Sequence, residues 1–410
     1  MASPSLSPPR GPEPEPVPEP APGAGRSRSW VPAVRRRLPD LLPLAGLVLT
    51  AALWGRSLPT VGAAAVGLVL AGAVLLAVTH AEAIAHRVGE PFGTLTLAVA
   101  VTIIEVGLIV TLSISDPAKS ATLARDTVFA AVMIVCNGIV GMALVVNARA
   151  THVVRFNEQG AFALLGTVLT LATLSLVMPT FTSSSVGPTY TGAQLGFAAV
   201  ASATLYGMFV FVQTVRHRWM FLSEIDPEPA HGTAQTVAPR PEPVAAAVAD
   251  PHPERSAPGL AGLVAPILRL LATLTVVVGL AKTLSGPIEG AVAWAGAPQS
   301  FVGVVIALLV LAPESVAAFR AAARGEMQTS LNLALGSGLA SIGLTIPAVA
   351  IASIWLAGPI QLGLGSKEIV LLAATAAISA LTFGSGRATV LQATHHLAVF
   401  AAFIFLALVP

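Results

Sequence analysis

Apolar residues in this chain gather into long runs that are separated by short polar stretches. A run of about 17 to 25 residues is long enough for a helix to cross roughly 30 Å of hydrocarbon. We predict eleven such helices, over residues 38–55, 59–80, 91–115, 124–147, 160–178, 192–214, 260–282, 300–323, 328–356, 367–384 and 388–409. The pattern therefore predicts an all-α polytopic membrane protein.

Two long polar stretches divide the chain. Residues 1–37 repeat Pro-Glu pairs, contain five arginines between Arg26 and Arg37 and show no apolar periodicity, so we expect a disordered cytoplasmic arm. Residues 216–259 are rich in Pro, Ala and Glu and are expected to form a cytoplasmic linker. The resulting order is the arm, a first transmembrane helix over 38–58, a five-helix repeat over 59–215, the linker, and a second five-helix repeat over 260–410.

Basic residues predict the orientation, because cytoplasmic loops carry an excess of Lys and Arg. If the amino terminus is cytoplasmic, that side receives the arm, the linker, Arg87, Arg149, Arg155, Arg216, Arg218, Arg320, Arg324 and Arg387, and the other side receives Arg56, Lys119, Arg125, Lys282 and Lys367. The carboxyl terminus is then outside. Since each repeat crosses five times, the second crosses in the opposite sense to the first, and the repeats are inverted.

Composition narrows the class of protein. Hydrophobic residues make up 55% of the chain and charged residues 10%, which argues against several soluble domains. A net charge of +2 gives no support for nucleic-acid binding, and the single cysteine, Cys136, excludes an intrachain disulfide and a cysteine-based metal cluster. We expect a protein of the bacterial cytoplasmic membrane whose partners are ions and the lipid bilayer. The sequence does not distinguish a monomer from a homo-oligomer.

Two glutamates occupy matching places in the two halves. Glu105 lies near the middle of the 91–115 run, and Glu314 lies near the middle of the 300–323 run, directly after Pro313. A carboxylate at bilayer depth costs on the order of 3 kcal/mol and usually faces a cavity, a partner or a substrate. We interpret the two acids as a shared cation and proton site at the interface of the repeats.

Small polar residues follow each acid in the next helix. Asn137 lies at the centre of the run after Glu105, and Ser337 and Ser341 lie in the run after Glu314. Oxygen ligands of these types suit hard cations such as Ca²⁺, and backbone carbonyls freed near Pro313 could add to them. Without a cation, desolvation and mutual repulsion favour protonation of both acids, so that protons and a cation compete for one site. That competition, with alternating access, is sufficient for antiport.

Four other titratable residues are candidates for the entry path of the ions or for gating. Glu82 and Glu90 lie at the predicted cytoplasmic ends of two spans, where a carboxylate can also cap a helix. His395 and His396 lie in the last helix, where they can relay protons or simply bond to neighbouring helices. The chain has no GxxxxGK[ST] phosphate-binding sequence, no zinc-protease spacing and no recognisable nucleophile-base pair. Neither ATP-driven pumping nor an enzyme activity is expected.

Several segments resemble a known family. GEPFGTLTLAVAVTIIEVGLIV, ARDTVFAAVMIVCNGIVG, LAPESVAAFRAA, SLNLALGSGLASIGLTIPAVA and LTFGSGRATVLQ are similar to bacterial ChaA-type calcium/proton antiporters of the calcium/cation antiporter superfamily, over about residues 40–220 and 260–409. The resemblance implies inverted five-helix repeats and export of Ca²⁺ against H⁺, often with Na⁺ or K⁺ as well. Its relatives carry a Gly-Asn-Ala-x-Glu type motif in each repeat; here the acids, Glu105 and Glu314, match that motif and the Gly-Asn pairs do not.

We therefore expect a secondary antiporter that exchanges cytoplasmic Ca²⁺, and also Na⁺ or K⁺, for external H⁺ without a cofactor. The departures near the acids leave open an Na⁺(K⁺)/H⁺ antiporter with little Ca²⁺ activity. A cation channel or a non-transporting membrane scaffold, in which the acids only bond to neighbouring helices, is the alternative from another class.

Overall fold

The computed structural model describes residues 31–56, 58–88, 92–115, 121–149, 152–222, 260–355, 358 and 360–410. The chain divides into two compact units, residues 1–39 and 40–410. Most of the expected arm and linker, residues 1–30 and 223–259, lies outside the described residues. Helix α1 (Val31–Leu53) begins before the boundary that the sequence suggested between residues 37 and 38.

Helices account for most of the second unit. They are α2 (Thr60–Val88), α3 (Phe92–Ser115), α4 (Leu123–Met133), α5 (Val140–Ala148), α6 (Glu158–Ala172), α7 (Met178–Phe181), α8 (Gly192–Phe211), α9 (Leu260–Trp294), α10 (Phe301–Ala323), α11 (Met327–Ala352), α12 (Ser366–Phe383) and α13 (Val390–Leu408). Wide π-helical turns, η1 (Ile134–Ile139), η2 (Thr173–Val177) and η3 (Val212–Arg216), interrupt or extend three of the crossings, and a 3₁₀ turn, η4 (Arg218–Phe221), follows η3.

The expected membrane-spanning pattern is confirmed. In the described part of the chain, ten helical segments are long and apolar enough to cross a membrane, and the shorter apolar helix Leu41–Leu53 brings the number to eleven. Helical segments satisfy their own backbone hydrogen bonds, as hydrocarbon requires. The protein is thus an all-α multi-pass membrane protein. The largest differences from the predicted bounds are at α2, which continues to Val88, and at α9, which continues past Pro287 to Trp294.

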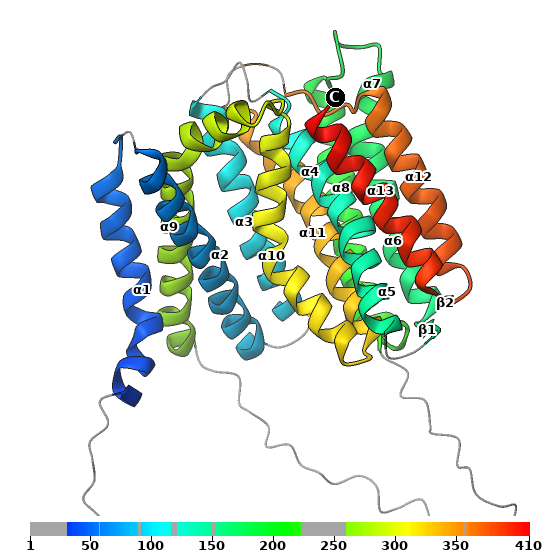
Figure 1. Ribbon diagram of the computed structural model, residues 1–410, viewed down its shortest axis with the longest axis horizontal. Coiled ribbons are helices and arrows are strands. Elements are labelled where there is room, and N and C mark those ends of the chain that lie inside the picture. Colours follow the sequence, from blue (N-terminus) through cyan, green and yellow to red (C-terminus); the bar gives the residue numbers. More distant parts are fainter. Residues whose placement is uncertain are drawn as a thin grey trace, which may run out of the picture. The chain divides into compact units, whose positions relative to one another are not determined.

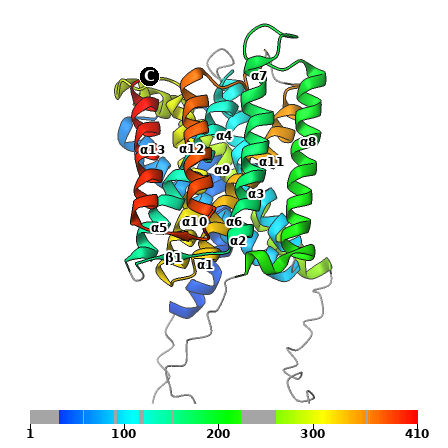
Figure 2. The ribbon, with the colours of Figure 1, turned by 90° about the vertical axis from the view of Figure 1, so that its right-hand side faces the viewer.

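The crossings form two groups that run in opposite senses. In Figure 1, α2 starts at the top of the picture and α9 at the bottom. Contacts between the two groups also match. Helix α3 packs against α11, and its counterpart α10 packs against α4. Likewise, α8 packs against α11, and its counterpart α13 packs against α5. Figure 2 shows α12 between α13 and α6 on one face of the helices. The contacts between the two groups are therefore made largely by α3, α10, α11 and the α4–η1–α5 crossing.

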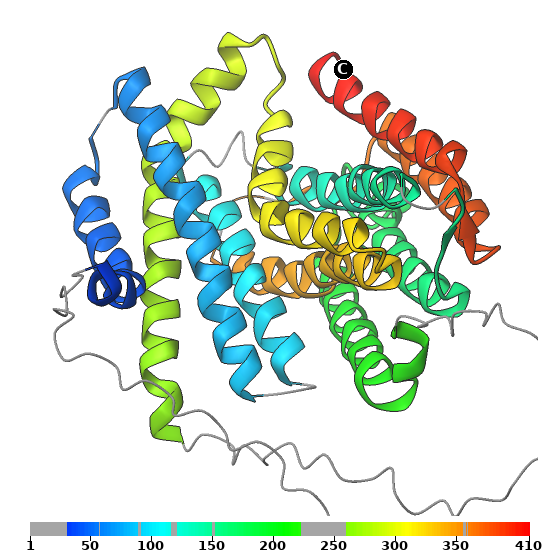
Figure 3. The same ribbon diagram turned by 60° about the horizontal axis from the view of Figure 1, so that its bottom comes forward.

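Helix α9 packs against α2 at the other edge, and the part of α1 that belongs to the second unit, residues 40–53, lies on its other side (Figure 3). Its contact with α1 is close because a glycine on each helix receives a β-branched side chain of the other: a Cβ on Gly46 would lie 2.8 Å from Val276, and one on Gly279 would lie 2.3 Å from Thr50. Small residues of this kind allow helices to approach closely in membranes. The first helix thus packs against the second group, outside both repeats.

Glycines also bring α10 and α11 against the α4–η1–α5 crossing. A Cβ on Gly303 of α10 would lie 2.8 Å from the backbone of Asp126 and Thr127 in α4. A Cβ on Gly338 of α11 would lie 3.1 Å from Val135 in η1. These approaches fix the rotation of α10 and α11, and therefore the direction in which their polar residues point.

A two-stranded antiparallel ladder that the sequence did not predict joins the two groups. Strand β1 (Val154–Arg155) pairs with β2 (Arg387–Ala388), with Val154 opposite Ala388. The turn before β2 uses Gly386 at a φ of 62°. Strands of two residues have no detectable period-2 pattern, which is why they escaped the sequence analysis.

Candidate cation-binding site

Glu105 is buried at the centre of the helices, with 1% of the residue exposed. The Oγ of Ser341 in α11 lies 2.8 Å from one oxygen of the Glu105 carboxylate and 2.7 Å from the other. The hydroxyl of Thr345, one turn further along α11, donates to Oε2 at 3.0 Å. The structure therefore brings together Glu105 and Ser341, which the sequence had proposed as site residues, and adds Thr345.

Thr345 was missed because a threonine in a membrane helix often donates to the carbonyl four residues before it. Thr102 and Thr375 do so here, at 2.9 and 2.8 Å. The available signal was the spacing, since Ser337, Ser341 and Thr345 recur every four residues and hence share one face of α11.

Glu314 has a different environment. It lies in α10 directly after Pro313, and its Oε2 is buried without a hydrogen-bond partner among the described residues. The side chain lines a cavity of about 530 Å³ between α2, α3, α8, α10 and α11. An oxygen of this kind beside a cavity is available to a cation or to a hydrogen-bond donor.

The cavity is lined by both polar and apolar side chains, and no basic side chain is among them. Its residues are Glu82, Ala85, Leu97, Ala98, Val101, Tyr206, Phe209, Val210, Gln213, Glu314, Thr329, Asn332, Leu333, Gly336, Ser337 and Ala340. Two carboxylates and no cation give it a negative character that favours positively charged ligands. The residues come from the end of α2 and the beginnings of α3 and α11, which places the cavity on the lower side of the helices in Figure 1.

Helix α11 connects the two acids. Ser337 and Ala340 line the cavity that contains Glu314, whereas Ser341 and Thr345 contact Glu105. One helix therefore presents hydroxyl groups to both environments. Glu105 is not itself among the residues lining the cavity. In this conformation Glu105 is enclosed by α11, whereas Glu314 borders the cavity.

Among the described residues, the hydrogen bonds of Asn137 go to neither acid. Its side chain is buried in η1, and its Nδ2 donates to Thr375 Oγ1 of α12 at 2.8 Å, with the sulfur of Met133 at 3.9 Å. Its Oδ1 is buried and has no partner among the described residues. The structure thus pairs Asn137 with α12 and leaves its oxygen, the atom that could bind a cation, unoccupied by any donor.

Of the remaining candidate residues that the structure describes, Glu82 lines the cavity and the two histidines do not. Glu82 is exposed and lines the cavity with Glu314. His396 is buried, and its Nε2 lies 3.0 Å from the hydroxyl of Thr382 in α12, while the neighbouring His395 is exposed. Neither histidine lines the cavity. Glu90 lies outside the described residues.

Backbone oxygen is available beside Glu314. Pro313 lies inside α10 and has no N–H, so the carbonyl of Leu309, four residues earlier, loses its helical donor. Such a carbonyl is a suitable ligand for a hard cation. The hydroxyl of Ser315, in contrast, is used within the helix, donating to the carbonyl of Leu311 at 2.7 Å.

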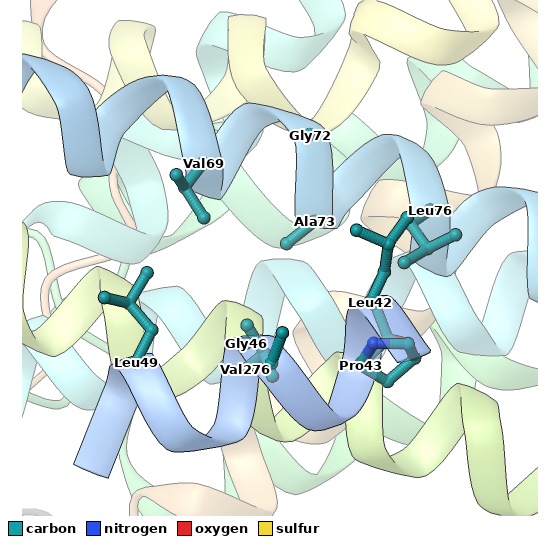
Figure 4. A pocket seen from close by; sticks show the side chains of 11 residues that line it. Leu42, Pro43, Gly46, Leu49, Val69, Gly72, Ala73, Leu76 and Val276 are labelled. Atoms are coloured by element: carbon teal, nitrogen blue, oxygen red, sulfur yellow. The ribbon is translucent and has the colours of Figure 1, made fainter. Parts of the chain in front are cut away.

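A second cavity, of about 360 Å³, lies between α1, α2 and α9 and has a different chemistry. Figure 4 shows the side chains of Leu42, Leu49, Val69 and Leu76 around it. Its only hydroxyl, that of Thr273, already donates to the carbonyl of Arg269 at 2.8 Å. The side chains of this cavity offer no free ligand for a cation. The candidate cation site is therefore the region that contains the two acids.

Comparison with known proteins identifies a family whose model covers both groups of helices, including the two helices that carry the acids. The sodium/calcium exchanger protein family matches residues 58–215 and 265–409, which are the two five-helix groups. The chain belongs to this family. It is accordingly a transmembrane antiporter of the calcium/cation type and not an enzyme, and the ions are its substrates.

Two relatives match nearly the whole chain. The y4hA protein of Sinorhizobium fredii (strain NBRC 101917 / NGR234) is 41% identical over 374 residues, covering 90% of this chain and 95% of the relative. The sodium-potassium/proton antiporter ChaA of Escherichia coli (strain K12) is 31% identical over 372 residues, covering 89% and 94%. The resemblance to ChaA-type antiporters is thereby confirmed.

Solved structures agree on the fold. Native YfkE superposes with a TM-score of 0.63 at 16% identity, covering 91% of this chain and 100% of that one. The H⁺/Ca²⁺ exchanger CAX superposes with a TM-score of 0.61 at 15% identity, covering 92% and 89%. At such identities the likeness is one of fold.

Proposed function

We propose that the protein exchanges cytoplasmic Ca²⁺, Na⁺ or K⁺ for external H⁺ by alternating access, with Glu105 and Glu314 binding the cation and protons in competition. The observation that carries this proposal is the pair of unlike environments at equivalent helices. Glu105 is enclosed by Ser341 and Thr345, whereas Glu314 has a buried oxygen without a donor beside a negatively lined cavity. An exchanger needs such acids to be reached from one side at a time.

Electrostatics couples the cation to protons. Two ionised carboxylates in a poorly solvated region repel each other, and both desolvation and repulsion favour their protonation. A cation between them removes the repulsion and makes the ionised forms favourable. Release of the cation on one side and of protons on the other then returns the site to its starting charge. A 1:2 exchange of Ca²⁺ for H⁺ is the simplest electroneutral form.

Asn137 is included in the proposed site because its position in the first repeat is equivalent to that of Ser341 in the second. Helices α3 and α11 pack together as α10 packs with α4 and η1, so Asn137 relates to Glu314 as Ser341 relates to Glu105. Asn137 Oδ1 and Glu314 Oε2 are both buried without donors. We propose that both oxygens bind the cation in the conformation that opens to the opposite side, and that Ser337 contributes while the site opens to the cavity.

The cavity is proposed to face the cytoplasm. The predicted orientation puts the end of α2 and the beginning of α11 on the cytoplasmic side of the cytoplasmic membrane, with the carboxyl terminus outside. Glu82 then lies along the path by which a cation reaches Glu314. Glu90 would belong to the same path. His395 and His396 retain a proposed role in proton movement, although the Thr382 contact is equally suited to holding α13 against α12.

Monovalent exchange is the second candidate. The relative from E. coli is named a sodium-potassium/proton antiporter, which favours Na⁺ and K⁺ as substrates. Ca²⁺ prefers six to eight oxygen ligands. Near Glu105 the described side chains supply two hydroxyls, and the uncharged oxygen-bearing side chains that line the cavity with Glu314 are Tyr206, Gln213, Thr329, Asn332 and Ser337. Backbone carbonyls and water must complete a Ca²⁺ site, whereas Na⁺ or K⁺ needs less charge.

Antiport is tested in inside-out vesicles with an acid interior, where a pH-sensitive dye follows dissipation of the gradient after Ca²⁺, Na⁺ or K⁺ is added. Wild type is compared with Glu105→Gln, Glu314→Gln and a control, Glu326→Gln. Arg324 donates two hydrogen bonds to Glu326, at 2.8 and 3.0 Å, which lowers the pKa of that carboxyl, so Glu326 carries a charge that lies outside the cavity.

We expect cation-dependent dissipation in wild type and Glu326→Gln and none in the two site variants. The ion that acts at the lowest concentration identifies the preferred substrate. Dissipation without any added cation would indicate a channel. Unchanged flux in Glu105→Gln and Glu314→Gln would refute the paired-acid site, and absence of flux with every cation would favour a scaffold.

A further inference from the structure

A cavity of about 530 Å³ lies between α1, α3 and α9, on the opposite side of the helices from the cavity that contains Glu314. The first half of α3 lines the Glu314 cavity, and its second half, at Ile103 and Ile114, lines this one. Trp54, which directly follows α1, and Lys282 of α9 are at the same end as Ile114. The cavity therefore reaches the membrane surface that is predicted to be external.

One charged side chain, Lys282, lines this cavity. Its ammonium lies over the ring of Trp54, 4.7 Å from the ring centroid. A tryptophan at a helix end is typical of the interface between hydrocarbon and lipid headgroups, and a lysine there extends its ammonium toward the surface. The ring holds the ammonium at the mouth of the cavity while leaving its N–H groups free to donate.

Below this charge the walls are mainly apolar, and the hydroxyl-bearing residues among them are Thr50, Thr111 and Thr275. Leu274 and Val278 are apolar, and the hydroxyls of Thr50 and Thr275 are already used within their own helices. Thr50 donates to the carbonyl of Gly46 at 2.8 Å, and Thr275 donates to that of Leu271 at 2.9 Å. The cavity thus combines a cationic mouth with an apolar interior.

The size argues against a helix of another protein as occupant. A helix with side chains is about 10 Å across and rises about 5.4 Å per turn, so the cavity holds little more than one turn of it. An extended hydrocarbon chain is narrower and can follow the space between three helices.

We propose that this cavity binds a phospholipid of the predicted outer leaflet, with its phosphate on Lys282 and an acyl chain between α1, α3 and α9. The site is separate from the cation path and does not depend on the proposed exchange. It nevertheless contacts the helix that carries Glu105. Gly107 of α3 packs closely on α9, where a Cβ would lie 2.7 Å from Val278. A bound chain therefore adds to the contacts that hold α3 against α9.

The test uses purified full-length protein in detergent and native mass spectrometry with added phosphatidylglycerol, compared with diacylglycerol of the same acyl chains. Lys282→Gln removes the charge, and Thr275→Phe places a ring in the cavity. Lys367→Gln is the matched control, because Lys367 is an exposed lysine on the same predicted side that does not line the cavity.

We expect wild type and Lys367→Gln to bind phosphatidylglycerol more tightly than diacylglycerol. Lys282→Gln should weaken phosphatidylglycerol binding about fivefold, the effect of one basic residue at an anionic lipid surface. Thr275→Phe should reduce binding of both molecules. The proposal is wrong if Lys282→Gln binds phosphatidylglycerol as wild type does, or if the two molecules bind equally. A lipid-free dimer that Thr275→Phe converts to a monomer would show that a second copy occupies the cavity.

Discussion

Ser341 and Glu105 meet across the boundary between the two five-helix groups, with the serine Oγ 2.8 and 2.7 Å from the carboxylate oxygens. The acid comes from the first group and the hydroxyl from the second. Any movement of one group against the other must therefore change this contact. The pair connects the chemistry of the buried acid to the relative position of the repeats.

Replacing Ser341 with Ala is expected to raise the cation KM of antiport at least about tenfold, since a hydrogen bond to a charged group contributes about 1.5 to 3 kcal/mol. Ser315→Ala is the control, because the Ser315 hydroxyl bonds only within α10. The measurement is cation-dependent proton flux in vesicles at several cation concentrations. Equal KM values for Ser341→Ala and wild type would show that the serine only packs.

The second donor, Thr345, allows a substitution that preserves shape. Thr345→Val keeps the volume and removes the hydroxyl that donates to Glu105 at 3.0 Å, whereas Thr345→Ser keeps the hydroxyl and removes a methyl group. We expect a weaker cation affinity in Thr345→Val and near wild-type affinity in Thr345→Ser, read from the same flux assay. If the serine variant is the more impaired, packing and not the hydrogen bond is the role of Thr345.

Glu82 is expected to assist cation access rather than form the transport site. It is exposed at the cavity and its removal lowers the local negative charge, so Glu82→Gln should raise the cation KM a few-fold and leave the maximal rate unchanged. The effect should shrink as ionic strength rises, because salt screens exposed charges. Glu326→Gln, on the same side but outside the cavity, is expected to behave as wild type. Complete loss of flux in Glu82→Gln would instead assign it to the transport site.

Asn137 and Thr375 separate a binding role from a packing role. Thr375→Val removes the acceptor of the 2.8 Å bond from Asn137 and should destabilise the protein by about 1 to 3 kcal/mol, seen as a lower unfolding temperature. Transport should persist in that variant, because the oxygen of Asn137 is unaffected. Asn137→Ala removes the proposed ligand and should abolish transport. Loss of transport in both variants, in proportion to their stability, would assign Asn137 to packing alone.

Competition at the acids gives a pH dependence with a definite sign. Raising the pH on the cytoplasmic side removes protons that compete with the cation, so the apparent cation KM should fall as that pH rises. Flux at fixed cation concentration is measured over a range of cytoplasmic pH at constant external pH. A KM that is independent of pH would mean that cation and protons bind at separate sites.

Hydrophobic length determined much of the architecture from the sequence alone. A crossing needs a minimum number of apolar residues wherever it lies, so the runs located the spans closely, with α3 expected over 91–115 and found at Phe92–Ser115. The cost of a carboxylate in hydrocarbon likewise singled out Glu105 and Glu314 before any contact was known. These features depend on the local chain and its solvent.

Tertiary structure decided which polar residues meet. Spacing along α11 places Ser337, Ser341 and Thr345 on one face, but only the close approach of Gly338 to Val135 and the packing of α3 fix where that face points. As a result, Ser341 contacts Glu105, and Ser337 lines the cavity. Packing also pairs the amide nitrogen of Asn137 with Thr375 of α12, a contact that its place in the sequence does not predict.

The physical reason is that hydropathy fixes how deep a residue lies, whereas helix rotation fixes what it touches. Rotation depends on side-chain fit between helices distant in the sequence. Glu105 and Ser341, for example, are 236 residues apart, and no local pattern connects them. The sequence therefore determined the spans and the two acids, and the packing of α3, α10 and α11 determined that one acid is enclosed and the other open.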